Sequence, residues 1–200
     1  MRSLPLLLVL ATTPAYADSF VGATGGLMIP LGDSHKNPAD GWSDMVSSSP
    51  KLGLRVGATG ESGLGGMISA DWTPISSNAQ SQFTDVSAHR FRILAQFLVD
   101  RDIASHIVFS GRAGVGVDIA HASYSAGVGG LSFSGSDTDT GLGFEFGGGV
   151  WFKLGNTEIG GEVALPVGLH SHKASNAQDI TLDYTSYDID LLFGVRLRSK

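Results

Sequence analysis

Apolar and charged side chains alternate along much of this 200-residue chain. Every odd-numbered position from 189 to 197 holds a large apolar residue, whereas the even-numbered positions from 188 to 198 hold Asp188, Asp190, Leu192, Gly194, Arg196 and Arg198. A period of two places successive side chains on opposite faces of a β-strand, and a helix has a different period. The pattern therefore predicts strands with one apolar face and one face of charge and glycine.

The same alternation predicts eight strands. Each is about as long as the ~9–11 residues with which a tilted strand crosses a bilayer. The pattern is clear at 90–100, 107–119, 142–153, 158–167 and 188–198, and weaker at 20–30, 51–59 and 64–73. The connections alternate between short turns, near 61–63, 100–105 and 155–157, and long polar loops, at about 31–50, 74–88, 120–140 and 169–185. Short turns at one end and long loops at the other are typical of a transmembrane barrel with both termini at the short-turn end.

The distribution of charge predicts which face of the strands points outward. The apolar face carries no Asp, Glu, Lys or Arg, and the opposite face carries eight residues of each sign with glycine between them. The lumen of an eight-stranded barrel is narrow enough for side chains to fill, and ions removed from water must be paired. The apolar face is therefore expected to contact lipid. The inward cations are Lys51, Arg55, Arg90, Arg92, Arg112, Lys153, Arg196 and Arg198, and the inward anions are Asp71, Asp100, Asp118, Glu145, Glu158, Glu162, Asp188 and Asp190.

These patterns predict an all-β fold, an eight-stranded antiparallel up-and-down transmembrane β-barrel formed by residues 18–200. Aromatic residues of the apolar face are expected in two belts at the membrane interfaces. Pro166 falls inside the seventh strand, where a closed barrel has no free edge, so a bulge or a loss of pairing is expected there. The belt residues are Phe20, Phe97, Phe109 and Phe152 at the short-turn end, and Trp72, Phe91, Phe144 and Tyr187 at the long-loop end.

Residues 1–17 have the layout of a secretory signal peptide. A basic Arg2 precedes an apolar run, and the small residues Ala15 and Ala17 supply a cleavage site. The run is shorter than the ~20 residues of a spanning helix, so export with cleavage is expected. The chain has no cysteine, which excludes disulfides and thiolate metal sites. Its net charge of −6 disfavours nucleic-acid binding.

The chain resembles the small outer-membrane β-barrels of Gram-negative bacteria, the OmpA-, OmpX- and OmpW-type proteins. The resemblance covers residues 18–200 as architecture, and the local match is "FGVRLRSK" at 193–200, similar to the Gly-x-Arg-apolar ending of such barrels. It implies a location in the cell outer membrane, contact with outer-membrane lipid and lipopolysaccharide, and insertion by the outer-membrane assembly machinery. A monomer without a cofactor is expected.

Six inward charges are expected nearest the middle of the lumen. Paired with one another they would plug the barrel, and a gate or polar conduit is the alternative. Eight strands leave an interior that side chains just fill, which favours the plug. The six are Arg55, Arg92, Arg112, Glu145, Glu162 and Arg196, and Arg112 is expected to pair with Glu145 or Glu162.

Two histidine motifs suggest other chemistry. His121-Ala122-Ser123 resembles the His-x-Ser of outer-membrane lipid A deacylases, in which serine attacks an ester with histidine as base. That family has Asn where this chain has Tyr124, so no catalytic residue is assigned. A second pair, on one strand face, could bind a metal with an acidic partner, but two histidines without a third fixed ligand are a weak signal. That pair is His170 and His172, with Asp179 or Asp183 as the acidic partner.

The sequence thus predicts an outer-membrane barrel that is not an enzyme. Its expected role is structural, adhesive or the passage of small solutes, with a lumen packed by paired charges. Two alternatives remain open. One is a lipid A deacylase-like esterase, and the other is a soluble secreted barrel that carries an apolar ligand with its apolar face inside.

Overall fold

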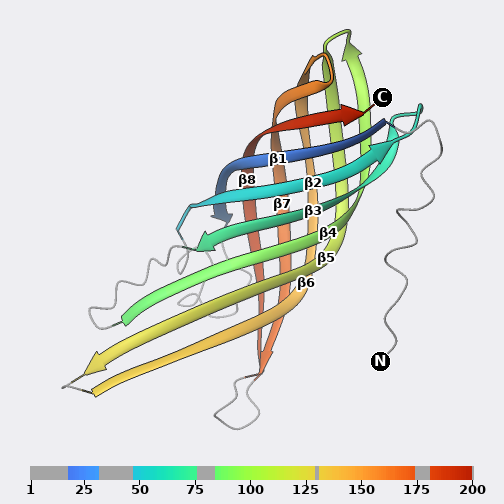
Figure 1. Ribbon diagram of the computed structural model, residues 1–200. Helices are drawn as coiled ribbons and strands as arrows, with labels where there is room; N and C mark the ends of the chain where they lie inside the picture. The colour runs from blue at the N-terminus through green and yellow to red at the C-terminus, as the bar shows by residue number, and fades with distance from the viewer. Residues whose placement is uncertain (1–17, 32–46, 76–83, 129–130, 174–180, 200) are drawn as a thin grey trace.

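The computed structural model describes residues 18–31, 47–75, 84–128, 131–173 and 181–199. These residues form a closed barrel of eight strands, each antiparallel to its neighbours in the chain, with β1 paired to β8 (Figure 1). The predicted fold is confirmed. None of the described residues forms a helix long and apolar enough to cross a membrane. The strands are β1 (Asp18–Leu31), β2 (Ser49–Thr59), β3 (Leu64–Ile75), β4 (Thr84–Ala104), β5 (Ile107–Val128), β6 (Leu131–Leu154), β7 (Thr157–Lys173) and β8 (Thr181–Ser199).

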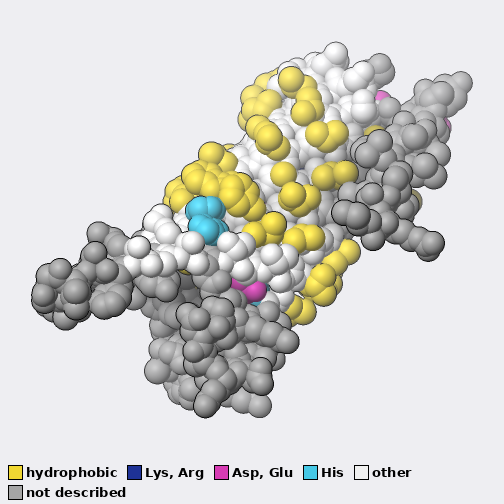
Figure 2. Space-filling view, turned by 60° about the horizontal axis from the view of Figure 1, so that its bottom comes forward, with side chains coloured by type: hydrophobic (Ala, Val, Ile, Leu, Met, Phe, Trp, Pro, Cys, Tyr) yellow, Lys and Arg dark blue, Asp and Glu magenta, His cyan; other side chains and the backbone are white. Residues whose placement is uncertain are grey.

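The apolar face of the strands forms the outside of the barrel. In β8, Phe193 is 76% exposed, whereas the neighbouring Leu192 is 1% exposed and Asp190 is fully buried. Figure 2 shows hydrophobic side chains spread over the outer wall. An apolar exterior around a charged interior is the reverse of a soluble carrier barrel, which keeps its apolar face inside. The structure therefore favours the lipid-facing orientation over the soluble carrier.

Phe20 is the one predicted belt aromatic that faces the lumen. Its side chain is 3% exposed and packs with Met67 and Leu98 in a small apolar cluster inside the barrel. In β1 the exposed Val21 shows that odd-numbered residues point outward, so even-numbered residues point inward. The belt expectation for Phe20 is wrong because the parity of its own strand places it beside the inward Gly22.

The strands extend farther than predicted at the long-loop end. β5 and β6 pair as far as Val128↔Leu131, so residues 120–128 and 131–140 are paired strands rather than part of the expected loop. β7 and β8 likewise pair as far as Lys173↔Thr181, inside the loop expected at 169–185. These segments contain many Ser, Thr, Ala and Gly residues and no strong apolar face. Alternation therefore does not reveal them, although pairing still satisfies their backbone groups.

Strands β4, β5 and β6 project beyond the barrel wall. Figure 1 shows β4, β5 and β6 continuing past the ends of β2 and β3. The pairing of β3 with β4 ends at Ile75↔Ala88, whereas β4 pairs with β5 as far as Thr84↔Ala126. We call residues 84–87, 123–128 and 131–136 the extension.

Glycine permits two of the short turns. Gly63 and Gly155 have φ angles of 76° and 68°, in the left-handed region that residues with a side chain rarely adopt. They lie in the turns expected near 61–63 and 155–157. The third turn is tighter than expected and moves to residues 105–106, because β4 continues to Ala104 with a register shift between Asp102 and Ala104.

β7 loses part of its pairing at Pro166. Its ladder with β8 passes from Ala164↔Asp190 to Val167↔Tyr187 with no pair in between, while Pro166 stays opposite Glu145 of β6. Proline has no N–H to donate, so the ladder is interrupted on one side. The loss of pairing expected at Pro166 is confirmed.

Candidate functional site: the charge network of the lumen

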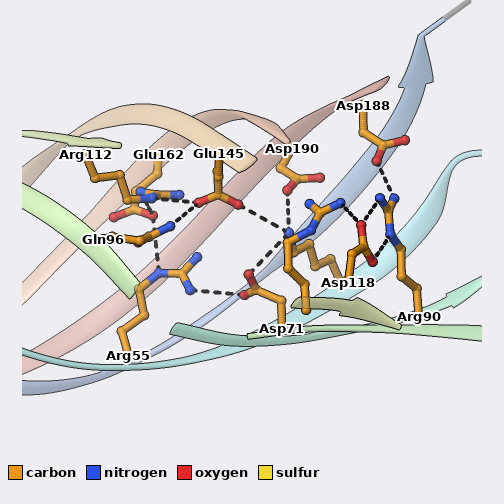
Figure 3. A network of polar contacts seen from close by, with 12 residues as sticks. Arg55, Asp71, Arg90, Gln96, Arg112, Asp118, Glu145, Glu162, Asp188 and Asp190 are labelled. Carbon is orange, nitrogen blue, oxygen red and sulfur yellow. Dashed lines mark hydrogen bonds and ion pairs between the residues drawn. The ribbon is translucent and has the colours of Figure 1, made fainter. Parts of the chain in front are cut away.

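The six charges expected near the middle of the lumen all point inward and are at most 6% exposed. They come from six strands, so the network ties distant parts of the sequence together. Five of them belong to one connected set of ion pairs, the central cluster, and Arg92 belongs to a second set, the outer cluster, nearer the long loops (Figure 3). The central cluster consists of Lys51, Arg55, Asp71, Asp100, Arg112, Glu145, Glu158, Glu162, Asp190, Arg196 and Arg198, and the outer cluster of Arg90, Arg92, Asp118 and Asp188.

Glu162 of β7 joins three cations of the central cluster. Its Oε2 accepts a hydrogen bond from Arg112 Nη1 at 2.5 Å and lies 3.7 Å from Arg55 Nε. Its Oε1 accepts a hydrogen bond from Arg196 Nη2 at 3.0 Å. Arg112 also donates from Nε to Glu145 Oε1 at 2.9 Å. Either glutamate was an expected partner of Arg112, and the structure gives it both.

Lys51 extends the central cluster toward the long-loop end. Its Nζ lies 2.5 Å from Asp190 Oδ2, 3.5 Å from Asp71 Oδ2 and 3.9 Å from Glu145 Oε2. Gln96 Nε2 donates to Glu145 Oε1 at 3.0 Å. Gln96 was not among the predicted lumen residues, because its only signal in the sequence is its inward parity on β4. The three carboxylates around Lys51 offset the three guanidinium groups around Glu162.

The outer cluster is centred on Asp118 of β5. Arg90 donates from Nε to Asp118 Oδ1 at 2.7 Å, and Arg92 donates from Nη2 to Asp118 Oδ2 at 2.7 Å. Arg90 also reaches Asp188 of β8, with its Nη1 2.7 Å from Asp188 Oδ2. A cavity of about 10 Å³ separates the two clusters and is lined by charged side chains of both, among them Lys51. That is room for about one water molecule.

Aromatic rings close the lumen toward the short turns. The guanidinium carbon of Arg196 lies 3.7 Å from the centroid of the Trp151 ring and 5.2 Å from that of Phe20, both within the range of cation–π attraction. Arg198 lies beyond Arg196, nearer the short turns, and forms an ion pair with Asp100. Its Nε also donates a hydrogen bond to Glu158 Oε1 at 2.8 Å. Neither ring was predicted as a partner of Arg196, although the parity of β6 places Trp151 inward.

The short-turn end of the barrel opens into a vestibule of about 400 Å³. Arg198, Asp100 and Glu158 form part of its lining. At its rim, Lys153 Nζ lies 2.6 Å from Asp102 Oδ1, and both of these side chains are partly exposed. The vestibule therefore ends at the ion pairs of Arg198.

Glycine makes room for these long side chains. A β-carbon on Gly53 would approach Thr24 Oγ1 to 2.6 Å, and one on Gly168 would lie 2.5 Å from both Arg90 Nη2 and Asp118 Oδ2. Such contacts are too short for a side chain to be added without displacing the ion pairs. At these two positions glycine leaves room for polar and charged neighbours, whereas at Gly26, Gly65 and Gly116 the atom closest to a β-carbon would be a backbone carbonyl oxygen of the paired strand.

The His-x-Ser motif lies on the outer face of β5, away from the lumen. His121 Nδ1 is 2.7 Å from Thr138 Oγ1, and Ser123 Oγ donates to the backbone oxygen of Ser87 at 3.3 Å. A catalytic serine is hydrogen-bonded to its base, and the base to an orienting acid. Here the two side chains have hydroxyl and backbone partners instead. The Tyr124 side chain lies outside the described part of the structure.

His170 lies inside the lumen beside the outer cluster. It is 4% exposed, with Nε2 3.6 Å from Asp118 Oδ2 and Nδ1 3.1 Å from Asp139 Oδ2. The side chains of His172 and Asp183, and all of Asp179, lie outside the described residues, so the predicted metal set stays a prediction. Among the described side chains, no group of three or more His, Cys, Asp and Glu is placed to hold a metal ion.

Solved bacterial barrels share the architecture of this chain. Ail, the attachment invasion locus protein of Yersinia pestis, is 15% identical with a TM-score of 0.55, over 92% of this chain and 99% of Ail. Neisserial surface protein A is 15% identical with a TM-score of 0.51, over 90% and 97%. A major outer membrane protein from Thermus thermophilus is 10% identical with a TM-score of 0.58, over 92% and 99%. No protein-family model and no curated protein matches the chain. The likeness confirms that the chain has the fold of small outer-membrane β-barrels.

Proposed function

We propose that the protein is an integral outer-membrane barrel with a closed lumen, which acts as a structural or adhesive element rather than as a passage. The observation that carries this proposal is the succession of buried ion pairs from Arg90 to Arg198. Each level of the lumen holds opposite charges in contact, and every level except the last, where Arg198 borders the vestibule, is removed from water. A solute that moved along the axis would have to separate them, and leaving a buried ion without its partner costs about 3–5 kcal/mol.

Planar-bilayer recordings test the closed lumen. The purified protein is expected to give only rare, small conductance steps. The matched comparison is a double variant, Arg112→Ala with Glu145→Ala, which removes one cation and one anion together and opens space within the central cluster. This variant is expected to conduct more often and with larger steps. Steady, large and weakly selective channels from the unaltered protein would contradict the proposal.

An adhesive role is favoured by the extension. It carries three strands beyond the barrel wall at the long-loop end, and its described outward side chains are small and polar, including Ser87, Ser123 and Ser136. Adhesion is consistent with the name of Ail, an attachment protein of the same fold. We propose that the extension meets partners outside the cell, while the barrel, as a monomer, contacts lipid and lipopolysaccharide and depends on the outer-membrane assembly machinery for insertion.

We also propose that the protein is not a lipid A deacylase. The partners of His121 and Ser123 leave the serine without its base. The acyl chains of lipid A, measured by mass spectrometry in cells that produce the protein, are expected to be the same with the unaltered chain and with Ser123→Ala. Loss of one acyl chain that depends on Ser123 would show that the barrel is an esterase.

A further inference from the structure

Two histidines face each other on the outside of the barrel, at the base of the extension. His89 of β4 and His121 of β5 are direct partners in the antiparallel ladder. Their ring centroids are 5.0 Å apart, with the ring planes tilted by 40°, and both side chains are partly exposed. Figure 2 shows histidine side chains together on the surface, between the hydrophobic wall and the polar strands beyond it.

We propose that His89 and His121 bind one divalent transition-metal ion. Imidazole is a preferred ligand of zinc, copper and nickel. With Zn–N bonds of about 2.0–2.1 Å, two imidazoles that share a tetrahedral ion have centroids roughly 5 Å apart. The observed separation of 5.0 Å has this value. The ladder fixes the distance because the two residues are directly opposite each other on paired strands.

Each ring is also held by a neighbour. His121 Nδ1 lies 2.7 Å from Thr138 Oγ1 of β6. With Nδ1–H donated to that hydroxyl, Nε2 is the nitrogen left for the metal, an arrangement that orients metal-binding histidines in proteins generally. His89 stands edge-on to Phe91, with centroids 5.6 Å apart and planes at 87°. Because these contacts already restrict both imidazole rings, metal binding costs less side-chain entropy.

We expect the site at the depth of the lipid headgroups. His89 is two residues beyond Phe91, a belt aromatic on the same outer face, and two residues from Ser87, where the extension begins. Two protein ligands leave coordination positions for water or for an oxygen of a lipid phosphate.

Cu²⁺ is the most suitable probe, since it forms the most stable complexes of the divalent first-row metals with nitrogen ligands. The full mature chain without an affinity tag, folded in detergent micelles, is titrated with Cu²⁺. We expect one saturable site per chain, with two imidazole nitrogens in the electron paramagnetic resonance spectrum. Thr138→Val keeps both ligands and removes the hydrogen bond that orients His121, so it is expected to weaken binding by about tenfold, the lower end for the loss of such a contact.

His89→Gln and His121→Gln are each expected to weaken binding more than Thr138→Val and to remove one imidazole from the spectrum. His106→Gln is the matched control, because His106 is exposed in the turn at the opposite end of the barrel. Its affinity should equal that of the unaltered chain. The side chains concerned are on the surface, so the variants should fold, which heat-dependent gel mobility can verify. Cu²⁺ affinity in His89→Gln and His121→Gln equal to that of the unaltered chain, absence of saturable binding, or loss of binding in His106→Gln would overturn the proposal.

Discussion

Replacing Glu162 by glutamine is expected to destabilise the folded barrel by about 3–5 kcal/mol, the cost of removing one partner from buried ion pairs. Glu162 is 3% exposed and contacts three guanidinium groups, those of Arg55, Arg112 and Arg196. The amide keeps the shape of the side chain but removes the charge, and it cannot accept at both ends as the carboxylate does. The change is measured as the free energy of unfolding in urea, with the protein folded into lipid vesicles.

Glu61→Gln is the control for that measurement. It makes the same chemical change at an exposed side chain in the turn between β2 and β3. A surface substitution of this kind is expected to stay within about 0.5 kcal/mol of the unaltered protein. If the two variants lose similar stability, water in the lumen must solvate the three guanidinium groups. The ion pairs of Glu162 would then contribute less to stability than their distances indicate.

The face on which each side chain lies could be predicted, because successive side chains of a β-strand point to opposite faces. Once Phe193 and Val195 are assigned to lipid, Gly194 and Arg196 must point into the lumen. The same reasoning, applied strictly to β1, places Phe20 inside. What parity cannot supply is the partner of each charge. Arg90 meets Asp188 across the lumen from a non-neighbouring strand, and that contact depends on the width and stagger of the closed barrel.

The histidine pair shows how much a contact between strands depends on the turn that joins them. His121 stands out in the sequence because of Ser123, but its ring contacts that of His89. Their pairing requires the turn at residues 105–106, and a turn at 100–105 would shift the register and separate them.

The extension could not be predicted for a different reason. Its strands carry little apolar surface, so no alternation of apolar and polar residues marks them. Alternation therefore marks the apolar part of each strand and not its continuation into the extension.

Arginine on the outer wall should be nearly as damaging as the loss of a lumen charge. Val115 and Val150 are 48% and 38% exposed on the outer face, and we expect both to lie near the middle of the membrane. An arginine at the bilayer midplane on the lipid face of a barrel costs about 2–4 kcal/mol. Val115→Arg and Val150→Arg are each expected to lower the free energy of folding into vesicles by that amount. Ser136→Arg is the control, since Ser136 is exposed on the extension, outside the apolar wall.

Single cysteines test the same orientation without adding charge. The chain has no native cysteine, so Val115→Cys and Val150→Cys each give one site for a fluorescent label, which lipid-borne quenchers should reach. The inward neighbours Gly114 and Gly149 are poor controls, because a β-carbon would lie 2.7 Å from the backbone oxygen of Ala95 or 2.8 Å from Glu162 Cγ. Ser69→Cys is better, since Ser69 is fully buried in the lumen and cysteine has nearly its size. That thiol should resist labelling in the folded barrel. Ready labelling at 69, with no quenching at 115 and 150, would mean that the apolar wall does not face lipid.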